Sequence, residues 1–325
     1  LKELNQFTPH IASSDMVFFH TLSDIQILGA TMWLMSFPEK DRPSSNFVLR
    51  FLNNRPHSDA LLQLCAANLS MPRMRARLST DTTELAALYT HMLRLPVDLI
   101  PIPHAPPELK VHRRTYVPDL APDTRVIGFV GDCRWAKGFH FVRPLIEAFK
   151  HSCSYPVHFL VQISAHAPSL EIDAETAALS AFPSELVTLV TETLSTEEYY
   201  ELLNECDIVL IAYHTGQFTH QSSGVFTEAT IAGKVTILPD GTAMHHEALR
   251  MGAGFRTFSQ FDAVSVMQAV YSAVADYPEL SERAKDAKVK MARYHNGDNL
   301  IAYLMGETVE TVSYTHLRAH ETRED

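Results

Sequence analysis

Two short loops in the second half of the chain carry residue types that suit a diphosphate. The first loop runs from Gly131 to Gly138, between a predicted strand and a predicted helix. Lys137 supplies a point charge, Arg134 supplies a planar fork of donors, and the start of the helix supplies unpaired N–H groups. The plainer alternative is a solvated loop in which both cations are incidental.

The second loop, Ser222 to Ala229, opens another predicted helix about ninety residues later. Gly224 lets the backbone approach a ligand closely, and Ser222 and Ser223 offer hydroxyl groups and a helix cap. Glu228, one turn into the helix, could accept hydrogen bonds from a ribose diol. Taken alone, the stretch also fits a plain N-cap and a surface glutamate. Because both loops follow strands and precede helices, we prefer a shared nucleotide site.

The two loops resemble motifs of family 4 of the glycosyltransferases and its GT-B relatives. The family motif G-x-x-R-x-x-K-G is matched at Gly131, Arg134, Lys137 and Gly138. The second half of its E-x7-E motif, with the A-x-x-x-G-x-P-V that follows, is matched at Glu228, Ala229, Gly233 and Val235, although the proline is absent. The first glutamate of that motif would fall at His220. Ser223-Gly224 resembles a branch of the family that has S-G there.

The resemblance implies a GT-B fold, with two Rossmann-like α/β domains, and a retaining glycosyltransferase. Such an enzyme moves a hexose from a nucleotide-diphosphate donor to a hydroxyl acceptor. We expect the acceptor to be a glycan or a lipid-linked molecule. Arg134, Lys137 and the helix end near Ser223 would stabilise the departing diphosphate, so neither a metal nor another cofactor is expected. Two alternatives stay open. A nucleotide-sugar epimerase or hydrolase on the same fold would have similar donor contacts, and the missing first glutamate leaves room for a non-catalytic binding module.

A third candidate lies near the start of the chain. Phe19-His20-Thr21, at the end of a predicted strand, is similar to the loop by which relatives aim a histidine at the donor. His20 is therefore the expected catalytic residue, against the alternative of a satisfied histidine at a strand end. Arg50, at the end of the next expected strand, could face the cleft between the domains or form a surface salt bridge.

The predicted elements explain how these loops could reach one edge of a sheet. In the first part of the chain, short β-branched runs alternate with segments of helical period, as in βαβ units. Strands are expected at 16–19, 46–51, 75–78 and 97–102. Helices are expected after Ser23 and around 60–67, and the capping-box spacing of Asp81 to Glu84 predicts a third that runs to Leu93.

A proline-rich segment, 103–122, lacks both hydrophobic periods and is the expected linker. The βαβ rhythm restarts with a strand at 125–130, and the next helix carries an apolar face of Val142, Leu145, Ile146 and Phe149. We therefore expect an N-terminal acceptor-side domain over 1–118 and a C-terminal nucleotide-sugar-binding domain over 119–311. In such folds ligands bind at the carboxyl ends of the strands.

Both ends of the chain carry further expectations. The chain starts at Leu1 rather than at an initiator methionine, so we expect the N-terminal domain to be incomplete. Residues 312–325 are similar to a translated transposase sequencing adapter, and we expect them not to be biological sequence.

Composition limits the partners. A net charge of −11 and a pI near 5.8 argue against nucleic acid. No G-x-G-x-x-G follows a predicted strand, which disfavours a nicotinamide dehydrogenase. The 4 cysteines are scattered, which fits a reducing compartment, and the cytoplasm is the expected location. Arg73, Arg75 and Arg77 could add weak contact with anionic lipid at the inner face of a membrane.

Overall fold

The computed structural model describes residues 2–50, 58–107, 115–150, 155–164 and 169–307. These residues divide into two compact units: the part up to Pro103 together with the helix that begins at Gly297, and His104–Asn296. The expected non-biological tail, 312–325, lies outside the described residues.

The division differs from the boundary expected at 118/119 for two physical reasons. The first unit ends at Pro103, because the backbone N–H groups of Thr115, Tyr116 and Val117 all donate to the carboxylate of Glu205 in the second unit. In addition, the last described helix returns to the first unit, a long-range contact that a pattern read along the chain does not contain.

The first unit is a parallel sheet of four strands in the order β1-β2-β3-β4. The strands are β1 (Met16–Leu22), β2 (Ser44–Leu49), β3 (Ala76–Thr80) and β4 (Val97–Leu99). The helices of this unit are α1 (Lys2–Asn5), α2 (Asp24–Ser36), α3 (Ser58–Leu69), α4 (Thr83–Leu93) and α13 (Gly297–Met305), with short 3-10 turns at Thr8–His10 and Glu39–Asp41. Strand and helix alternate as the sequence predicts.

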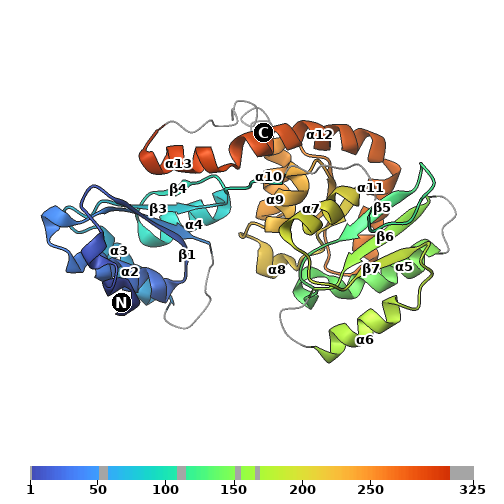
Figure 1. Ribbon diagram of the computed structural model, residues 1–325, viewed down its shortest axis with the longest axis horizontal. Coiled ribbons are helices and arrows are strands. Elements are labelled where there is room, and N and C mark those ends of the chain that lie inside the picture. Colours follow the sequence, from blue (N-terminus) through green and yellow to red (C-terminus); the bar gives the residue numbers. More distant parts are fainter. Residues whose placement is uncertain (1, 51–57, 108–114, 151–154, 165–168, 308–325) are drawn as a thin grey trace, which may run out of the picture. The chain divides into compact units, whose positions relative to one another are not determined.

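The two faces of this sheet are covered from different parts of the chain, as Figure 1 shows. Along β2, Phe47 and Leu49 pack in the core formed with α2, α3 and α4, whereas Val48 packs on the opposite face with Ile100 and Leu300. Leu300 belongs to α13, so this distant helix shields the face that α2 and α3 leave bare. Successive side chains of a strand point to opposite faces of the sheet. Because β2 carries apolar residues at successive positions, both faces must be buried.

The carboxyl end of β1 is irregular. The register of β1 against β2 shifts between Phe19 and Leu22, and Thr21 has a φ of 64°. A positive φ strains a β-branched residue, and such strain persists only where the surroundings impose it. His20 therefore lies next to a strained residue in the irregular carboxyl end of β1.

The second unit is a six-stranded parallel sheet in the order β10-β9-β8-β5-β6-β7. Its strands are β5 (Arg125–Phe129), β6 (Val157–Gln162), β7 (Val187–Val190), β8 (Ile208–Leu210), β9 (Val235–Pro239) and β10 (Phe255–Phe258). Its helices are α5 (Val142–Lys150), α6 (Leu170–Leu179), α7 (Thr196–Glu205), α8 (Thr215–Phe218), α9 (Gly224–Ile231), α10 (Ala243–Met251), α11 (Ala263–Ala275) and α12 (Tyr277–Tyr294), with 3-10 turns at Trp135–Lys137 and Phe139–Phe141. The strand order reverses at β5, which is where such sheets bind ligands.

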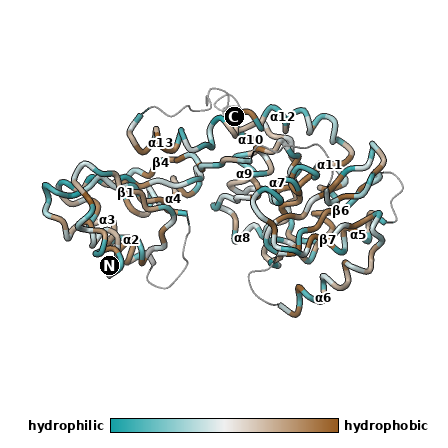
Figure 2. The backbone as a smooth tube through the Cα atoms, viewed as in Figure 1, coloured by the Kyte–Doolittle hydropathy of each residue, from teal (hydrophilic) through white to brown (hydrophobic). Residues whose placement is uncertain are grey.

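Two helical layers enclose this sheet (Figure 1). Side chains of α5 and α11 form the core on one face, and side chains of α7, α9 and α10 form the core on the other. The predicted apolar face of α5 is confirmed, since all four of its residues are buried. Figure 2 shows α12 as mainly hydrophilic along its length, and its buried residues Leu280, Ala284, Ala287 and Met291 form a narrow stripe.

The spacing of Ser195 and Glu198 predicts a capping box at the start of α7, and the structure confirms it. The backbone N–H of Ser195 donates to Glu198 at 2.7 Å, and the N–H of Glu198 donates back to the Ser195 hydroxyl at 3.2 Å. In the part of the chain that the structure describes, no helix combines the length and apolar composition that a membrane span requires.

Candidate functional site

The loop after β5 is anchored to the neighbouring strand. The backbone N–H of Gly131 donates to Gln162 Oε1 at 2.8 Å, and the N–H of Cys133 donates to the carbonyl of Ser164 at 2.7 Å. Gly131 and Gly138 have φ values of 93° and 79°, which glycine adopts without strain. The loop is therefore a fixed turn on the carboxyl edge of the sheet.

The two cations of this loop differ in environment. The Arg134 side chain is 57% exposed and ion-paired with the buried carboxylate of Asp132. Lys137 is half-buried, and its ammonium lies 5.3 Å from the centre of the Tyr213 ring. Burial and the nearby charge of Arg134 lower the pKa of Lys137 below its ordinary range. A charged Lys137 is therefore incompletely compensated, and a bound anion would supply the missing charge.

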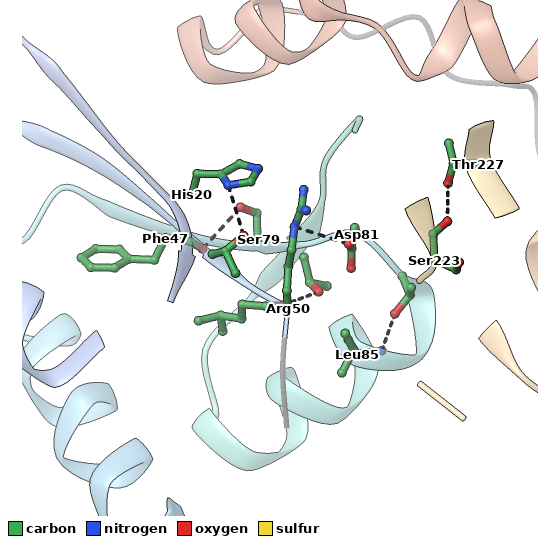
Figure 3. Close-up of polar contacts among 12 residues, drawn as sticks. His20, Phe47, Arg50, Ser79, Asp81, Leu85, Ser223 and Thr227 are labelled. Carbon is green, nitrogen blue, oxygen red and sulfur yellow. Dashed lines mark hydrogen bonds and ion pairs between the residues drawn. The ribbon is translucent and has the colours of Figure 1, made fainter. Parts of the chain in front are cut away.

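The second loop caps α9 as predicted. The N–H of Phe226 donates to the Ser223 hydroxyl at 3.3 Å. The Thr227 hydroxyl donates to the Ser223 carbonyl at 3.2 Å (Figure 3). Ser223 is buried and Ser222 half-buried, whereas Gly224 is exposed at the first turn of the helix. The exposed backbone of Gly224 leaves the amino end of α9 accessible to a ligand.

The structure brings the two loops together at the ends of β5 and β8. Tyr213 connects them, because its ring lies beside Lys137 and its hydroxyl accepts a 3.3 Å hydrogen bond from Ser223. Burial raises the pKa of Tyr213 to about 12, so the hydroxyl stays protonated near neutral pH. A Cβ on Gly131 would lie 3.2 Å from Val225, which shows how closely the first loop approaches α9.

Glu228 lies in the same cluster of residues and has two distinct oxygens. Its Oε2 accepts a 2.7 Å hydrogen bond from the hydroxyl of Tyr199, a residue of α7. Its Oε1 lies 3.8 Å from the position that a Cβ on Gly224 would occupy. The carboxylate also acts electrostatically on Lys137. Of the predicted residues, Gly131, Arg134, Lys137, Ser222, Ser223, Gly224 and Glu228 therefore share one edge of the second unit.

His20 lies in the first unit, at the carboxyl end of β1. Its side chain is exposed, and Nδ1 lies 3.1 Å from the Thr21 hydroxyl. Partial burial, followed by the positive charge of Arg50, lowers the pKa of His20. His20 is therefore neutral at pH 7, able to accept or donate a hydrogen bond but carrying no charge.

Arg50 forms a salt bridge with Asp81, which is one of the two alternatives expected for it. The position of Asp81 also corrects the capping box predicted at the start of α4. The Arg50 Nε lies 3.4 Å from Oδ2 of Asp81, whose side chain is only 2% exposed (Figure 3). The expected capping box from Asp81 to Glu84 is wrong by one residue: Thr82 is the N-cap of α4 and accepts from the N–H of Leu85. Asp81 is the last residue before the cap, where the strand end turns its carboxylate to Arg50.

Two of the three arginines considered for lipid contact have partners within the first unit. Arg75 donates to the carbonyl of Ser13 at 2.6 Å, and Arg77 donates to the carbonyls of Tyr303 and Leu304. Arg73 is exposed and lies 3.4 Å from an oxygen of Glu39. Contact with anionic lipid stays a prediction. Arg75 and Arg77 would have to give up these backbone hydrogen bonds to reach a lipid headgroup, whereas Arg73 would give up only its ion pair with Glu39.

Sequence reasoning missed two tyrosines of the site, Tyr199 and Tyr213. The signals available were their positions, one turn inside a capped helix and three residues after β8. Neither position indicates by itself which loop the hydroxyl will meet. Among the described residues, no group of three or more His, Cys, Asp or Glu side chains could hold a metal ion.

Comparisons with solved structures show the fold. The chain is similar to HepE of Anabaena in complex with UDP, with a TM-score of 0.66 and 13% identity over 94% of this chain and 81% of that one. It is also similar to a UDP-forming trehalose-phosphate synthase of Burkholderia xenovorans (TM-score 0.64, 13% identity, 94% and 77% covered). A third similar structure is the catalytic domain of starch synthase IV of Arabidopsis thaliana, bound to ADP and acarbose. Its TM-score is 0.65 and its identity 12%, over 93% of this chain and 74% of that one.

No family model matches the chain, and no curated protein matches its sequence. The structural likeness establishes the GT-B fold of these glycosyltransferases, with Rossmann-like parallel sheets, as the sequence predicts. The assignment to family 4 stays a prediction.

Proposed function

We propose that the protein is a retaining glycosyltransferase that moves a hexose from a nucleotide-diphosphate donor to a hydroxyl acceptor without a metal ion. The observation that carries the proposal is the meeting of Arg134, Lys137 and the amino end of α9 at one edge of the second sheet. Solved structures of the same fold hold UDP or ADP.

The chemistry assigned to this edge is electrostatic. Negative charge develops on the diphosphate as the bond to the sugar breaks, and fixed donors placed in advance stabilise that charge without reorganising. Lys137 and Arg134 supply the positive charge, and the unpaired N–H groups at the start of α9 supply oriented dipoles. Glu228 is proposed to accept hydrogen bonds from the ribose. These cations perform the role that Mg²⁺ has in metal-dependent transferases.

The first test is a thermal-shift screen of UDP, ADP and GDP, each with magnesium and with EDTA. A nucleotide that binds only the folded protein raises its melting temperature. Arg134→Ala combined with Lys137→Ala should abolish the shift, whereas the matched pair Arg283→Ala and Lys285→Ala, exposed on α12 in the same unit, should retain it. A shift that requires magnesium, or that survives in the first double variant, would contradict the proposed site.

The second test concerns the reaction. Incubation of the bound nucleotide's sugar conjugate with and without hydroxyl acceptors distinguishes transfer from its alternatives. Release of free sugar or an epimer without an acceptor indicates a hydrolase or epimerase, and binding without turnover indicates a binding module. The stereochemistry of the product decides whether the configuration is retained.

His20 is proposed to position the transferred sugar. Its neutral imidazole and the strained Thr21 beside it suit a fixed hydrogen-bonding role. His20→Ala should lower kcat while the affinity for the nucleoside diphosphate stays unchanged, because the proposed nucleotide contacts all belong to the second unit. An unchanged kcat would remove His20 from the mechanism.

A further inference from the structure

The orientation of Glu228 depends on a residue from another helix. Glu228 is on α9, and Tyr199 is on α7, twenty-nine positions earlier in the chain. The 2.7 Å contact between the Tyr199 hydroxyl and Oε2 is short, as expected for a hydrogen bond to a carboxylate. A glutamate side chain has three rotatable bonds, and this hydrogen bond restricts them.

The same contact leaves the other carboxylate oxygen available to a ligand. Oε1 faces the exposed Gly224 at the first turn of α9, 3.8 Å from where a Cβ would lie. A hydroxyl of a bound ribose can reach that oxygen beside a diphosphate held at the start of the helix. Because glycine has no side chain, the approach over Oε1 stays open.

The protonation state of Tyr199 favours separate roles for the two carboxylate oxygens of Glu228. Burial and the neighbouring carboxylate raise the pKa of Tyr199 far above its ordinary range. The phenol therefore keeps its proton across the working pH range and donates it to Oε2. The aromatic ring of Tyr199 packs at the edge of the core on that face of the sheet, so the hydroxyl is held in place.

From this geometry we infer that Tyr199 is the positioning residue for ribose recognition: it fixes Glu228 so that Oε1 selects nucleotides with an intact ribose diol. The inference rests on the proposed function, which places the nucleotide at this edge. It names the ligand class more narrowly, as ribonucleoside rather than 2′-deoxy- or 3′-deoxynucleoside diphosphates. Tyr199 acts through Glu228 and does not touch the ligand itself.

The test is calorimetric titration of the wild-type protein and of Tyr199→Phe. The probes are the nucleoside diphosphate that gives the largest thermal shift, its 2′-deoxy and 3′-deoxy forms, and inorganic pyrophosphate. Tyr199→Phe should lower the affinity for the ribonucleotide about tenfold, as when a hydrogen bond to a charged group is lost. The affinity for pyrophosphate should not change, so the preference for ribose over deoxyribose should shrink.

Two further variants separate positioning from general damage. Tyr271→Phe removes a tyrosine hydroxyl on the opposite face of the same sheet, where the ring stacks on Phe149, and it should leave every affinity unchanged. In the Glu228→Ala background, Tyr199→Phe should have no further effect on ribose preference, because its target is gone. A merely structural role would instead weaken ribonucleotide and pyrophosphate alike.

The outcomes separate this inference from the proposed function. If the wild-type protein binds no nucleoside diphosphate, the proposed function fails and the inference fails with it. If it binds and prefers ribose, but Tyr199→Phe keeps that preference or adds to Glu228→Ala, the inference alone is overturned.

Discussion

Gly138 offers a sharp test of how the diphosphate loop is held. Its φ is 79°, and a Cβ at this position would lie 2.3 Å from the carbonyl oxygen and 2.5 Å from the Cβ of Ala212, at the end of β8. Gly138→Ala must therefore adopt a strained backbone and also push a backbone carbonyl away. The left-handed conformation costs about 1–2 kcal/mol, and overpacking adds about 1–3 kcal/mol.

Gly241 provides the matched control in the same unit. Its φ is 66°, but no described atom lies within 4 Å of a Cβ placed there. Gly241→Ala should therefore lose only the conformational part, about 1–2 kcal/mol, against about 2–5 kcal/mol for Gly138→Ala. At about 2–4 °C per kcal/mol, the expected falls in Tm are roughly 2–8 °C and 4–20 °C.

The assay is thermal and urea unfolding, each followed by circular dichroism, with nucleotide titration as a further measurement. Gly138→Ala should also weaken nucleotide binding, because displacing the loop from β8 moves Lys137 away from Tyr213 and Ser223. Equal losses of stability in the two variants would refute the packing argument, since they would show that the close approach to Ala212 costs nothing.

Three other predictions follow from charges and burial. Glu205→Ala should lower the free energy of unfolding by about 2–4 kcal/mol and speed hydrogen exchange at residues 115–117, because their N–H groups lose a charged acceptor; unchanged exchange would contradict this clamp. Since the pKa of Lys137 is lowered, the diphosphate affinity measured by calorimetry should fall as the pH rises and the ammonium loses its proton, at a lower pH than for an ordinary lysine. Lys137→Arg should keep its affinity over the same range, because the guanidinium stays charged. Burial raises the pKa of the Cys133 thiol to about 11 and that of Cys206 to about 12, so iodoacetamide at pH 8 should label both only after unfolding, as mass spectrometry of the native and denatured protein would show.

Local features of the fold could be predicted from the sequence because their causes are local. The buried face of α5 follows from apolar residues at helical spacing, and the start of α7 follows from the reciprocal Ser195–Glu198 cap. Both depend on residues within one or two turns. The alternation of strands and helices likewise predicted two parallel sheets, which the structure contains.

Features that depend on distant partners could not be predicted in this way. Composition and period do not show that α13 returns to cover the first sheet, where Leu300 meets Val48 and Ile100. Nor do they show that Glu205 binds the linker. This contact joins residues 115–117 to the second unit, and the structure divides at 103/104 where the sequence pattern predicts 118/119. Some stretches of regular structure, among them α6, α10 and β10, also escaped prediction because their patterns are short or mixed.

The same distinction between local causes and distant partners applies to the candidate site. The sequence by itself determined the residue types of the two loops and their places after strands, because glycine, cations and a helix cap are each recognisable from their neighbours. Only the tertiary structure decided that Gly131 approaches Val225, that Tyr213 lies between Lys137 and Ser223, and that Tyr199 holds one oxygen of Glu228. Those contacts join separate strands and helices, and their geometry is set when the sheet brings its carboxyl ends to one edge.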